Sequence, residues 1–334
     1  MKILYLSCHS ILEYDELIML TELGHEVKSH GAYRDPRGAY TLPRPGIPLM
    51  QYDEDWMQLT AINPKTDLKP EMYEWADVII IMSGENEATL RANWDRIKHK
   101  RVILRMIGQS TPSNELMLKK YRNEGLEIVR YSPKEANMQN YAGEDAMIRF
   151  AKDPDEFSGW NGKDAVPINF SQSLKGRGRS VHYDEIMGSM VGFTGAKVYG
   201  TGNNDLGTFN GGEMPYEELK RLLRDSGCFI YGGTWPAPYT LTFMEAMMTG
   251  IPIVAISRVI AHLPEREQFD FYEVEEILAT AGVTSCSSVE QMREKIIYYL
   301  QNKDEFDSKK MRDKAIELFG KENIKKQWEQ FLER

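Results

Sequence analysis

The chain has 334 residues, with 41 Lys and Arg against 50 Asp and Glu, which gives a formal net charge of −9. This length exceeds a usual single core, so we expect two domains of about 150 to 170 residues each. The hydrophobic fraction of 42% and the charged fraction of 27% are ordinary globular values, which excludes a disordered or fibrous chain. No apolar run approaches the ~20 residues that span a bilayer, and no secretory signal peptide is recognisable, so we expect a cytoplasmic protein without a transmembrane segment.

The cysteines and the distribution of charge exclude further classes. Cys8, Cys228 and Cys286 are widely separated and form neither a disulfide framework nor a metal-binding knuckle. Acidic residues exceed basic residues in both halves of the chain, so neither half is a basic module. A local basic groove is still compatible with this charge, because net charge describes only the average field.

The first half alternates short apolar runs with longer amphipathic stretches, the pattern of strands and helices that take turns in a parallel sheet. The predicted strands cover residues 3–6, 27–30, 78–82, 101–107 and 126–131, and the predicted helices cover residues 12–23, 87–98 and 114–123. Between residues 34 and 70 the pattern lapses and prolines accumulate. A segment of this kind is typical of a functional loop or lid, here with a short helix near residues 55–59.

A second alternating series follows a polar stretch rich in turn formers at residues 151–163. We place the domain boundary there, which predicts one domain of residues 1–158 and another of residues 159–334, with the option that the last helix packs back on the first domain. The predicted strands are 166–170, 196–199, 228–231 and 253–256, and the predicted helices are 183–191, 216–225, 242–249, 289–301, 308–319 and 322–332. The fold class is therefore α/β, with two Rossmann-like domains that face each other across a cleft and additional C-terminal helices.

The most informative segment runs from residue 232 to residue 255 and reads as strand end, loop, helix and new strand. Amides at the start of the helix, near Tyr239–Thr242, would be free to bind a phosphate or sugar hydroxyls. Glu245, one turn inside, can accept two hydrogen bonds from vicinal hydroxyls such as those of a ribose. An ordinary βαβ unit with a solvated glutamate explains the pattern equally well.

The run Glu-Ala-Met-Met-Thr-Gly-Ile-Pro-Ile-Val-Ala from Glu245 resembles the signature of the family 4 nucleotide-sugar glycosyltransferases, which have the GT-B fold. The family motif contains two glutamates separated by seven residues, and the first of them would fall at Ala237. The opening strand, the Gly-His-Glu-Val run at residues 24–27 and the Gly-x-Gly turn at residues 200–202 are also similar to those enzymes. The resemblance implies a UDP-hexose as co-substrate, no cofactor, and retaining transfer.

The resemblance also implies roles for single residues of the second domain. Glu245 would bind the nucleotide ribose, and Gly200 and Gly202 would precede the base pocket. Cations near the donor diphosphate have a physical reason as well, because they stabilise the negative charge that develops on the leaving group, although a merely solvated turn is the alternative. The predicted donor-binding residues are Ser173, Lys175, Arg177, Arg179, Gly200, Gly202, Pro238, Tyr239, Thr240, Leu241 and Glu245.

No metal site is predicted, because the chain has no Asp-x-Asp motif and no histidine cluster with ligand spacing. The transfer is therefore expected to be independent of a metal ion.

Candidates in the first domain follow from the edge at which open parallel sheets bind ligands. His9 ends the first strand at that edge, and Glu13 and Asp15 follow within the next turn. These three are the predicted catalytic residues, since an imidazole or carboxylate there could orient or deprotonate an acceptor hydroxyl. A helix-capping acid and a satisfied histidine explain them at least as well. The predicted acceptor-binding residues are Arg34, Arg37, Ser83, Glu85 and Gln109.

The sequence thus predicts a glycosyltransferase with a nucleotide-sugar donor and an acceptor of one of two kinds. One kind is an envelope glycan or lipid, and the other is a 5-hydroxymethylpyrimidine in bacteriophage DNA. For DNA, a phosphate-tracking groove is predicted from the arginines of the proline-rich segment and from a basic cluster. The cluster consists of Arg91, Arg96, Lys98, Lys100, Arg101 and Arg105. A non-catalytic nucleotide-sugar binding module and a nucleotide-sugar 2-epimerase are the alternative functions.

Overall fold

The computed structural model describes residues 1–7, 9–30, 55, 67–84, 87–262 and 271–334. The chain divides into two compact units. Unit 1 comprises Met1–Ala151 together with Glu322–Arg334, and unit 2 comprises Lys152–Lys321. The division therefore follows residue 151 rather than residue 158, and the last helix is grouped with the first unit.

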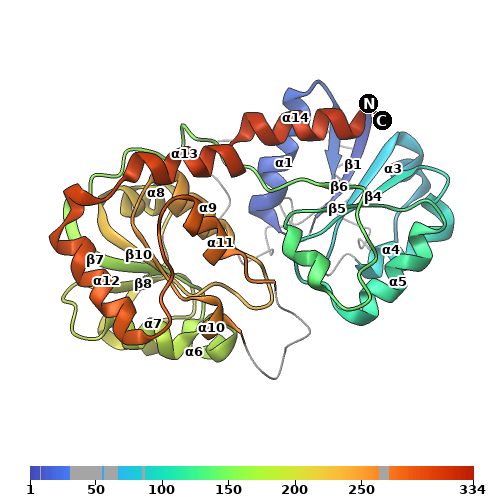
Figure 1. The fold of residues 1–334 in the computed structure, drawn as a ribbon. Helices are drawn as coiled ribbons and strands as arrows, with labels where there is room; N and C mark the ends of the chain where they lie inside the picture. Colours follow the sequence, from blue (N-terminus) through green and yellow to red (C-terminus); the bar gives the residue numbers. More distant parts are fainter. Residues whose placement is uncertain (8, 31–54, 56–66, 85–86, 263–270) are drawn as a thin grey trace. The chain divides into compact units, whose positions relative to one another are not determined.

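Unit 1 contains a six-stranded parallel sheet in the order β2-β1-β3-β4-β5-β6 (Figure 1). Its strands are β1 (Lys2–Leu6), β2 (Glu26–Ser29), β3 (Val78–Met82), β4 (Arg101–Arg105), β5 (Glu127–Arg130) and β6 (Ala146–Met147). All five residues of β3 are buried, as expected for a strand that is covered on both faces. Every predicted strand of this half is confirmed to within two residues at its ends.

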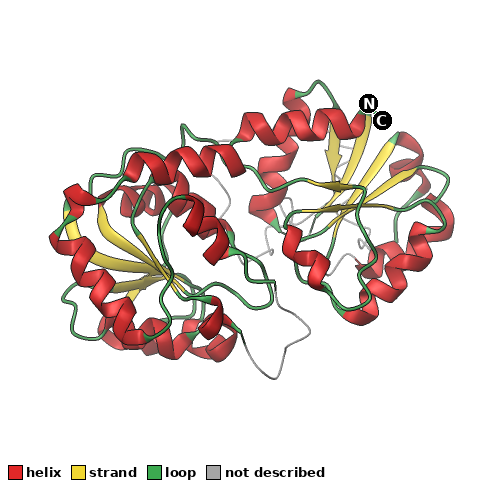
Figure 2. Cartoon of the chain, viewed as in Figure 1, coloured by secondary structure: helices red, strands yellow, loops and turns green. Residues whose placement is uncertain are grey.

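Helices cover both faces of this sheet (Figure 2). They are α1 (Ser10–Glu22), α3 (Pro70–Trp75), α4 (Glu87–Ile97), α5 (Pro112–Arg122), the 3-10 helix η2 (Pro133–Asn137) and α14 (Lys321–Leu332). The helix α5 begins where the sequence dictates, because the Thr111 side chain accepts a hydrogen bond from the Asn114 N–H and Pro112 occupies the first turn. On the face that α3, α4 and α5 cover, the core contains Leu4, Ile79, Leu90, Leu104 and Leu118.

On the other face, the side chain of Arg105 is fully buried beneath α1 and α14. Its Nε donates to Glu16 Oε1 at 2.8 Å, and Glu16 also accepts a hydrogen bond from the Tyr5 hydroxyl. The guanidinium lies over the ring of Trp328 in α14, 5.5 Å from its centroid. This network fastens α1 and α14 to the sheet through one charged group.

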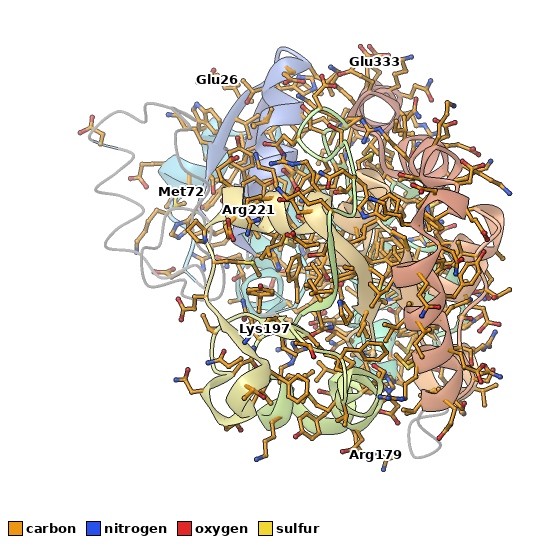
Figure 3. The ribbon with its side chains drawn as sticks, turned by 90° about the vertical axis from the view of Figure 1, so that its left-hand side faces the viewer. Glu26, Met72, Arg179, Lys197, Arg221 and Glu333 are labelled. Carbon is orange, nitrogen blue, oxygen red and sulfur yellow. The ribbon has the colours of Figure 1, made fainter. Side chains whose placement is uncertain are left out.

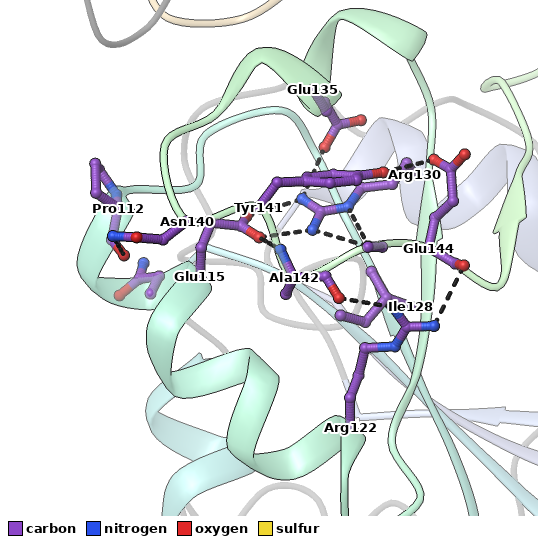
Figure 4. Close-up of polar contacts among 12 residues, drawn as sticks. Pro112, Glu115, Arg122, Ile128, Arg130, Glu135, Asn140, Tyr141, Ala142 and Glu144 are labelled. Atoms are coloured by element: carbon purple, nitrogen blue, oxygen red, sulfur yellow. Dashed lines mark hydrogen bonds and ion pairs between the residues drawn. The ribbon is translucent and has the colours of Figure 1, made fainter.

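A second buried arginine, Arg130 in β5, fastens the segment that follows η2 (Figure 4). Its two terminal nitrogens donate to the two oxygens of Glu115 at 2.9 and 2.8 Å. Glu115 Oε2 also accepts from the Ala142 N–H at 2.7 Å, and the guanidinium lies over the Tyr141 ring. The pairing with Glu115 is bidentate, and a second buried carboxylate, Glu135, lies 3.5 Å from the guanidinium.

Unit 2 contains a five-stranded parallel sheet in the order β11-β10-β7-β8-β9. Its strands are β7 (Asp164–Phe170), β8 (Lys197–Tyr199), β9 (Asn210–Gly212), β10 (Ser226–Tyr231) and β11 (Ile253–Ala255). The four predicted strands of this half are confirmed, and β9 is an additional short edge strand. Glycine and asparagine make up β9, so it lacks the apolar run by which strands are recognised in a sequence.

The helices of unit 2 include those predicted for the second half except the last, which is α14 of unit 1, together with several short ones. They are α6 (Leu174–Arg177), α7 (Tyr183–Met190), α8 (Tyr216–Asp225), α9 (Leu241–Thr249), α10 (Arg258–Ala261), α11 (Val274–Thr280), α12 (Val289–Gln301) and α13 (Ser308–Phe319), with 3-10 helices η3 (Gly178–Val181), η4 (Asn204–Phe209) and η6 (Lys303–Glu305). The segment that follows β7, for which no helix was predicted before residue 183, is thus partly helical. No helix in the described part of the chain is both long and apolar enough to cross a membrane.

Replacing Glu16 by Gln should lower the free energy of unfolding by about 3 to 5 kcal/mol, since the variant leaves the charge of Arg105 buried and uncompensated. Urea denaturation at neutral pH measures the difference. The matched control is Asp313→Asn, which breaks the exposed Lys309–Asp313 pair, whose side chains are 84% and 56% exposed. The control should cost at most about 1 kcal/mol. Equal losses in the two variants would contradict the structural role of the buried pair.

Candidate functional site

The strand order of unit 2 identifies the end of the sheet at which a ligand should bind. The order reverses between β7 and β10, and the segments that follow these two strands pack on opposite faces of the sheet. In open parallel sheets the crevice at such a switch point, outside the carboxyl ends of the strands, is the ligand-binding position. The loops after β7, β8 and β10 all begin at this end of the sheet. They contain most of the predicted donor-binding residues.

The loops after β7 and β8 are joined by a buried asparagine that the sequence did not single out. The side chain of Asn203 donates to the carbonyls of Ser171 and Gly200 at 2.6 and 3.1 Å. Its Oδ1 accepts from the N–H of Leu174, the first residue of α6, at 2.9 Å. In addition, the N–H of Ser173 donates to the Thr201 carbonyl at 2.7 Å. These bonds fix the start of the basic segment relative to the sheet.

Gly200 is required by this junction for two reasons. Its φ of +134° lies in a region that L side chains rarely adopt, and a Cβ at this position would lie 2.6 Å from the Ser171 carbonyl oxygen. Gly202 is similarly close, since its Cβ would lie 3.2 Å from Ser173 Cβ. The Gly-x-Gly turn therefore allows the two loops to approach each other closely.

The three cations of the basic segment are exposed, and one of them reaches the loop after β10. Arg177 Nη2 donates to Thr234 Oγ1 at 3.2 Å. Lys175 is 4.0 Å from Asp205, a distance at the limit of an ion pair between side chains that are about half exposed. Figure 3 shows Arg179 at the surface of unit 2. All three predicted cations thus lie on the segment that follows β7, and Arg177 links that segment to the loop after β10.

The loop after β10 leads into α9, and its conformation is held at several points. The Trp235 N–H donates to the Ser180 carbonyl at 2.8 Å, and the Pro238 carbonyl accepts from the Glu273 N–H at 3.1 Å. The Tyr231 hydroxyl accepts from the Thr240 N–H at 2.9 Å and donates to Thr240 Oγ1. Thr240 is the N-cap of α9 but its side chain makes no capping hydrogen bond, so the first amides of the helix are available to an anion.

Two predicted donor-binding residues of this loop have their side chains in the core. Tyr239 is buried between the rings of Phe243 and Phe319, with centroid distances of 6.2 and 5.3 Å. Pro238 is also buried. A ligand role for either residue would therefore involve its backbone, whereas Leu241 and Thr240 lie at the helix N-terminus itself and are partly exposed.

Glu245 lies one turn inside α9 and is almost completely buried. Its Oε1 is 2.9 Å from Nζ of Lys152, whose side chain is fully buried. Glu245 is therefore not the solvated glutamate of an ordinary βαβ unit. Lys152 was not predicted, because no motif marks a lysine at the start of a polar, turn-rich stretch.

In unit 1 the strand order reverses between β1 and β3. His9 lies at this edge as the N-cap of α1, and its Nδ1 accepts from the Leu12 N–H at 3.4 Å. Asp15 is partly exposed, whereas Glu13 is fully buried and accepts a hydrogen bond from the Ser29 hydroxyl. The structure therefore separates the three predicted catalytic residues, with Glu13 inside the unit and His9 at the sheet edge.

The predicted acceptor-binding residues are described only in part. Arg34, Arg37 and Glu85 lie outside the described residues. Ser83 is buried, and its hydroxyl accepts from the Ile107 N–H at 3.0 Å, which joins the loops after β3 and β4. Gln109 is exposed two residues further along the second of these loops.

Only part of the basic cluster between residues 91 and 105 is available for the predicted phosphate-tracking groove. Arg105 is fully buried and paired with Glu16, so it is unavailable to a polyanion. Arg101 pairs with Glu127 and also donates to the carbonyls of the last turn of α14. Successive side chains of β4 point to opposite faces of the sheet, and helices cover both faces. Arg105 therefore points into the unit, whereas the sequence analysis placed it with the surface cations. Three other cations of the cluster, Arg96, Lys98 and Lys100, each have an acidic partner.

No group of three or more His, Cys, Asp or Glu side chains suited to a metal ion occurs among the residues that the structure describes.

At the edge of unit 1, the carboxyl group of Glu87 has a pKa well above its ordinary value. Burial raises the pKa of Glu87, in the first turn of α4, to about 7, while Arg91 opposes this rise and Glu115 adds to it. Hydrogen bonds from the Gly84 backbone and the Asn114 side chain act against the rise as well. Nothing in the sequence distinguishes Glu87 from other acids in the first turn of a helix.

Because the pKa of Glu87 is higher in the folded protein than the ordinary 4.5, its protonated form stabilises the fold below pH 4.5 and this contribution is lost as the pH rises through about 7. The wild type should therefore lose stability relative to Glu87→Gln between these pH values, by on the order of 3 kcal/mol. Urea unfolding at several pH values measures the difference. Asp67→Asn is the control, because hydrogen bonds from Lys69 and Arg96 lower the pKa of Asp67 below this range. A difference between the wild type and Glu87→Gln that does not vary with pH would contradict the assignment.

Comparison with known proteins identifies the fold of this chain and assigns no family to it. No protein-family model matches the chain, and no curated protein sequence matches it. Among solved structures, HepE of Anabaena in complex with UDP-glucose is similar over 100% of this chain and 99% of its own, with 12% identity and a TM-score of 0.68.

Two further glycosyltransferases show the same likeness. The enzyme from Rickettsia africae is similar over 99% of this chain and 98% of its own, with 13% identity and a TM-score of 0.65. The calicheamicin glycosyltransferase CalG4 is similar over 100% and 98%, with 12% identity and a TM-score of 0.51. Two parallel sheets flanked by helices, in a chain that matches these enzymes over its whole length, constitute the α/β fold of the GT-B glycosyltransferases.

Proposed function

We propose that this chain is a glycosyltransferase that moves a hexose from a nucleoside-diphosphate sugar to an acceptor hydroxyl. The contact between Arg177 and Thr234 carries the proposal, because it joins the segments after β7 and β10 at the switch point of the sheet. A cation and the uncapped amides of α9 thereby lie at the end of the sheet where open α/β folds bind ligands.

The chemistry of transfer explains why positive charge is needed there. As the glycosidic bond breaks, the leaving nucleoside diphosphate gains negative charge. Lys175, Arg177 and Arg179, together with the first amides of α9, supply compensating charge without a metal ion. In this proposal Glu245 accepts hydrogen bonds from the ribose hydroxyls.

The proposed donor is UDP-glucose or a similar UDP-hexose. HepE, whose fold extends over the whole length of this chain, has been crystallised with UDP-glucose and with UDP and glucose. Retention of the anomeric configuration is proposed from the resemblance of the segment that begins at Glu245 to the family 4 signature.

For the acceptor we propose a hydroxyl of a glycan or glycolipid, bound by unit 1. Of the cations in the basic cluster that would have tracked a DNA backbone, four are paired with acids and Arg105 is buried. The four are Arg96, Lys98, Lys100 and Arg101. Hydroxymethylated DNA is therefore kept as an outcome of the test and not as the proposal.

Replacing Arg177 by Ala should weaken binding of UDP by about tenfold, because a charge-assisted contact to the diphosphate contributes roughly 1.5 kcal/mol or more. Binding of uridine should not change, since it has no phosphate. Isothermal titration calorimetry measures both affinities. Lys309→Ala, which removes an exposed cation from α13, is the matched control. The donor assignment fails if the wild type binds no UDP, or if both variants behave alike.

Transfer itself is tested with radiolabelled UDP-glucose and three acceptors: a mixture of envelope glycans and lipids, hydroxymethylated DNA and unmodified DNA. Label in the glycan fraction, with an axial anomeric bond by NMR, is the expected result. Label in hydroxymethylated DNA alone would replace the proposed acceptor. Conversion of the sugar to its 2-epimer without an acceptor would indicate an epimerase, and binding without any turnover would indicate a non-catalytic module.

A further inference from the structure

A fully buried lysine is paired with the carboxylate that the proposed function assigns to the ribose. Nζ of Lys152 lies 2.9 Å from Glu245 Oε1, and the two side chains are 0% and 3% exposed. Both members of the ion pair are therefore buried. Glu245 also lies on the same face of α9 as Leu241 and Thr242, four and three residues earlier, at the N-terminus where the free amides are.

Packing alone does not account for a buried ion pair of this kind. Removing a lysine and a carboxylate from water costs several kcal/mol per ion, and an apolar pair of similar volume is often as stable or more stable. The ion pair does, however, fix the rotamer of the carboxylate. The contact uses Oε1, and a carboxylate can accept about four hydrogen bonds over its two oxygens, so Oε2 can serve a second partner.

Lys152 is itself held rigidly by its backbone. Its N–H donates to the Phe319 carbonyl at 2.8 Å, and its carbonyl accepts from the Lys321 N–H at 3.0 Å. The helix α13, which ends at Phe319, is bonded to α9 in turn, because the Arg312 guanidinium donates to the Met248 carbonyl. The cation and the carboxylate therefore belong to elements that are fastened to each other.

We propose that Lys152 is a positioning residue of the donor site: it holds the Glu245 carboxylate in one orientation, so that Oε2 accepts hydrogen bonds from the 2′- and 3′-hydroxyls of the donor ribose. This inference rests on the proposed function. It adds a residue from outside the loops at the end of the sheet and makes ribose recognition depend on it.

The test compares two ligands, UDP and 2′,3′-dideoxy-UDP, which lacks both ribose hydroxyls. Lys152→Met keeps the length of the side chain and removes its charge. The variant should bind UDP about tenfold more weakly than the wild type, because a carboxylate that is no longer held in place is a poorer acceptor for the ribose hydroxyls. Its affinity for the dideoxy ligand should equal that of the wild type. Calorimetry measures the four affinities, and circular dichroism verifies that the variant is folded.

A merely structural role of Lys152 would lower the affinity for both ligands equally, and that result would overturn the proposal. If Lys152→Met does not fold, Lys152→Gln is measured instead, since its amide keeps a hydrogen-bond donor toward Glu245, and the same selective loss is expected in smaller measure. Failure of the wild type to bind UDP would overturn the proposed function. Equal affinities of the wild type for the two ligands would overturn the ribose assignment of Glu245, and with it the role of Lys152.

Discussion

All strands of a parallel sheet point the same way, so their carboxyl ends meet at one edge, and the candidate site depends on this constraint. In unit 2 the edge gathers segments that are far apart in sequence, from Ser171 to Thr240. The chemistry of the site then requires only that these loops approach closely and stay in place. Gly200 permits the close approach, and the Asn203 side chain stabilises it by hydrogen bonds to the Ser171 and Gly200 carbonyls.

Buried charge is the second theme, and it serves different purposes in the two units. Arg105 and Arg130 of unit 1 are surrounded by acceptors and rings, and each fastens a separate piece of chain to the sheet. In unit 2 the pair of Lys152 and Glu245 leaves an oxygen of the carboxylate with spare acceptor capacity. The first two hold elements of the fold together, as expected of structural groups, whereas the third lies beside the first turn of α9.

The regular part of the fold could be predicted from the sequence because it follows from local patterns. Apolar runs such as Val78–Met82 and the amphipathic helices α12 and α13 were found with correct bounds. Elements made of glycine and asparagine, such as β9, carry no such pattern and were missed. The loops after β7, β8 and β10 were predicted to lie together, since glycine, cations and a helix start mark them.

The contacts of individual side chains could not be predicted from the sequence. Arg105 looked like one more surface cation, and only the pleat of β4 and the cover of α1 and α14 make it a core residue. Glu13 looked like a free acid near a sheet edge, yet it faces Ser29 of the neighbouring strand. Such assignments depend on the facing element, which is distant in sequence and unknown until the chain is folded.

The bridge between Lys152 and Gly320 has a consequence for biosynthesis. Because the chain enters and leaves unit 2 at neighbouring residues, unit 2 is one continuous polypeptide inserted into unit 1, which is made of two separate stretches. The second stretch carries Trp328, fully buried in the core of unit 1. On the ribosome, the unit that is begun first is therefore completed last, after the whole of unit 2 has emerged, and until then the face of the sheet that α14 covers lacks its partner.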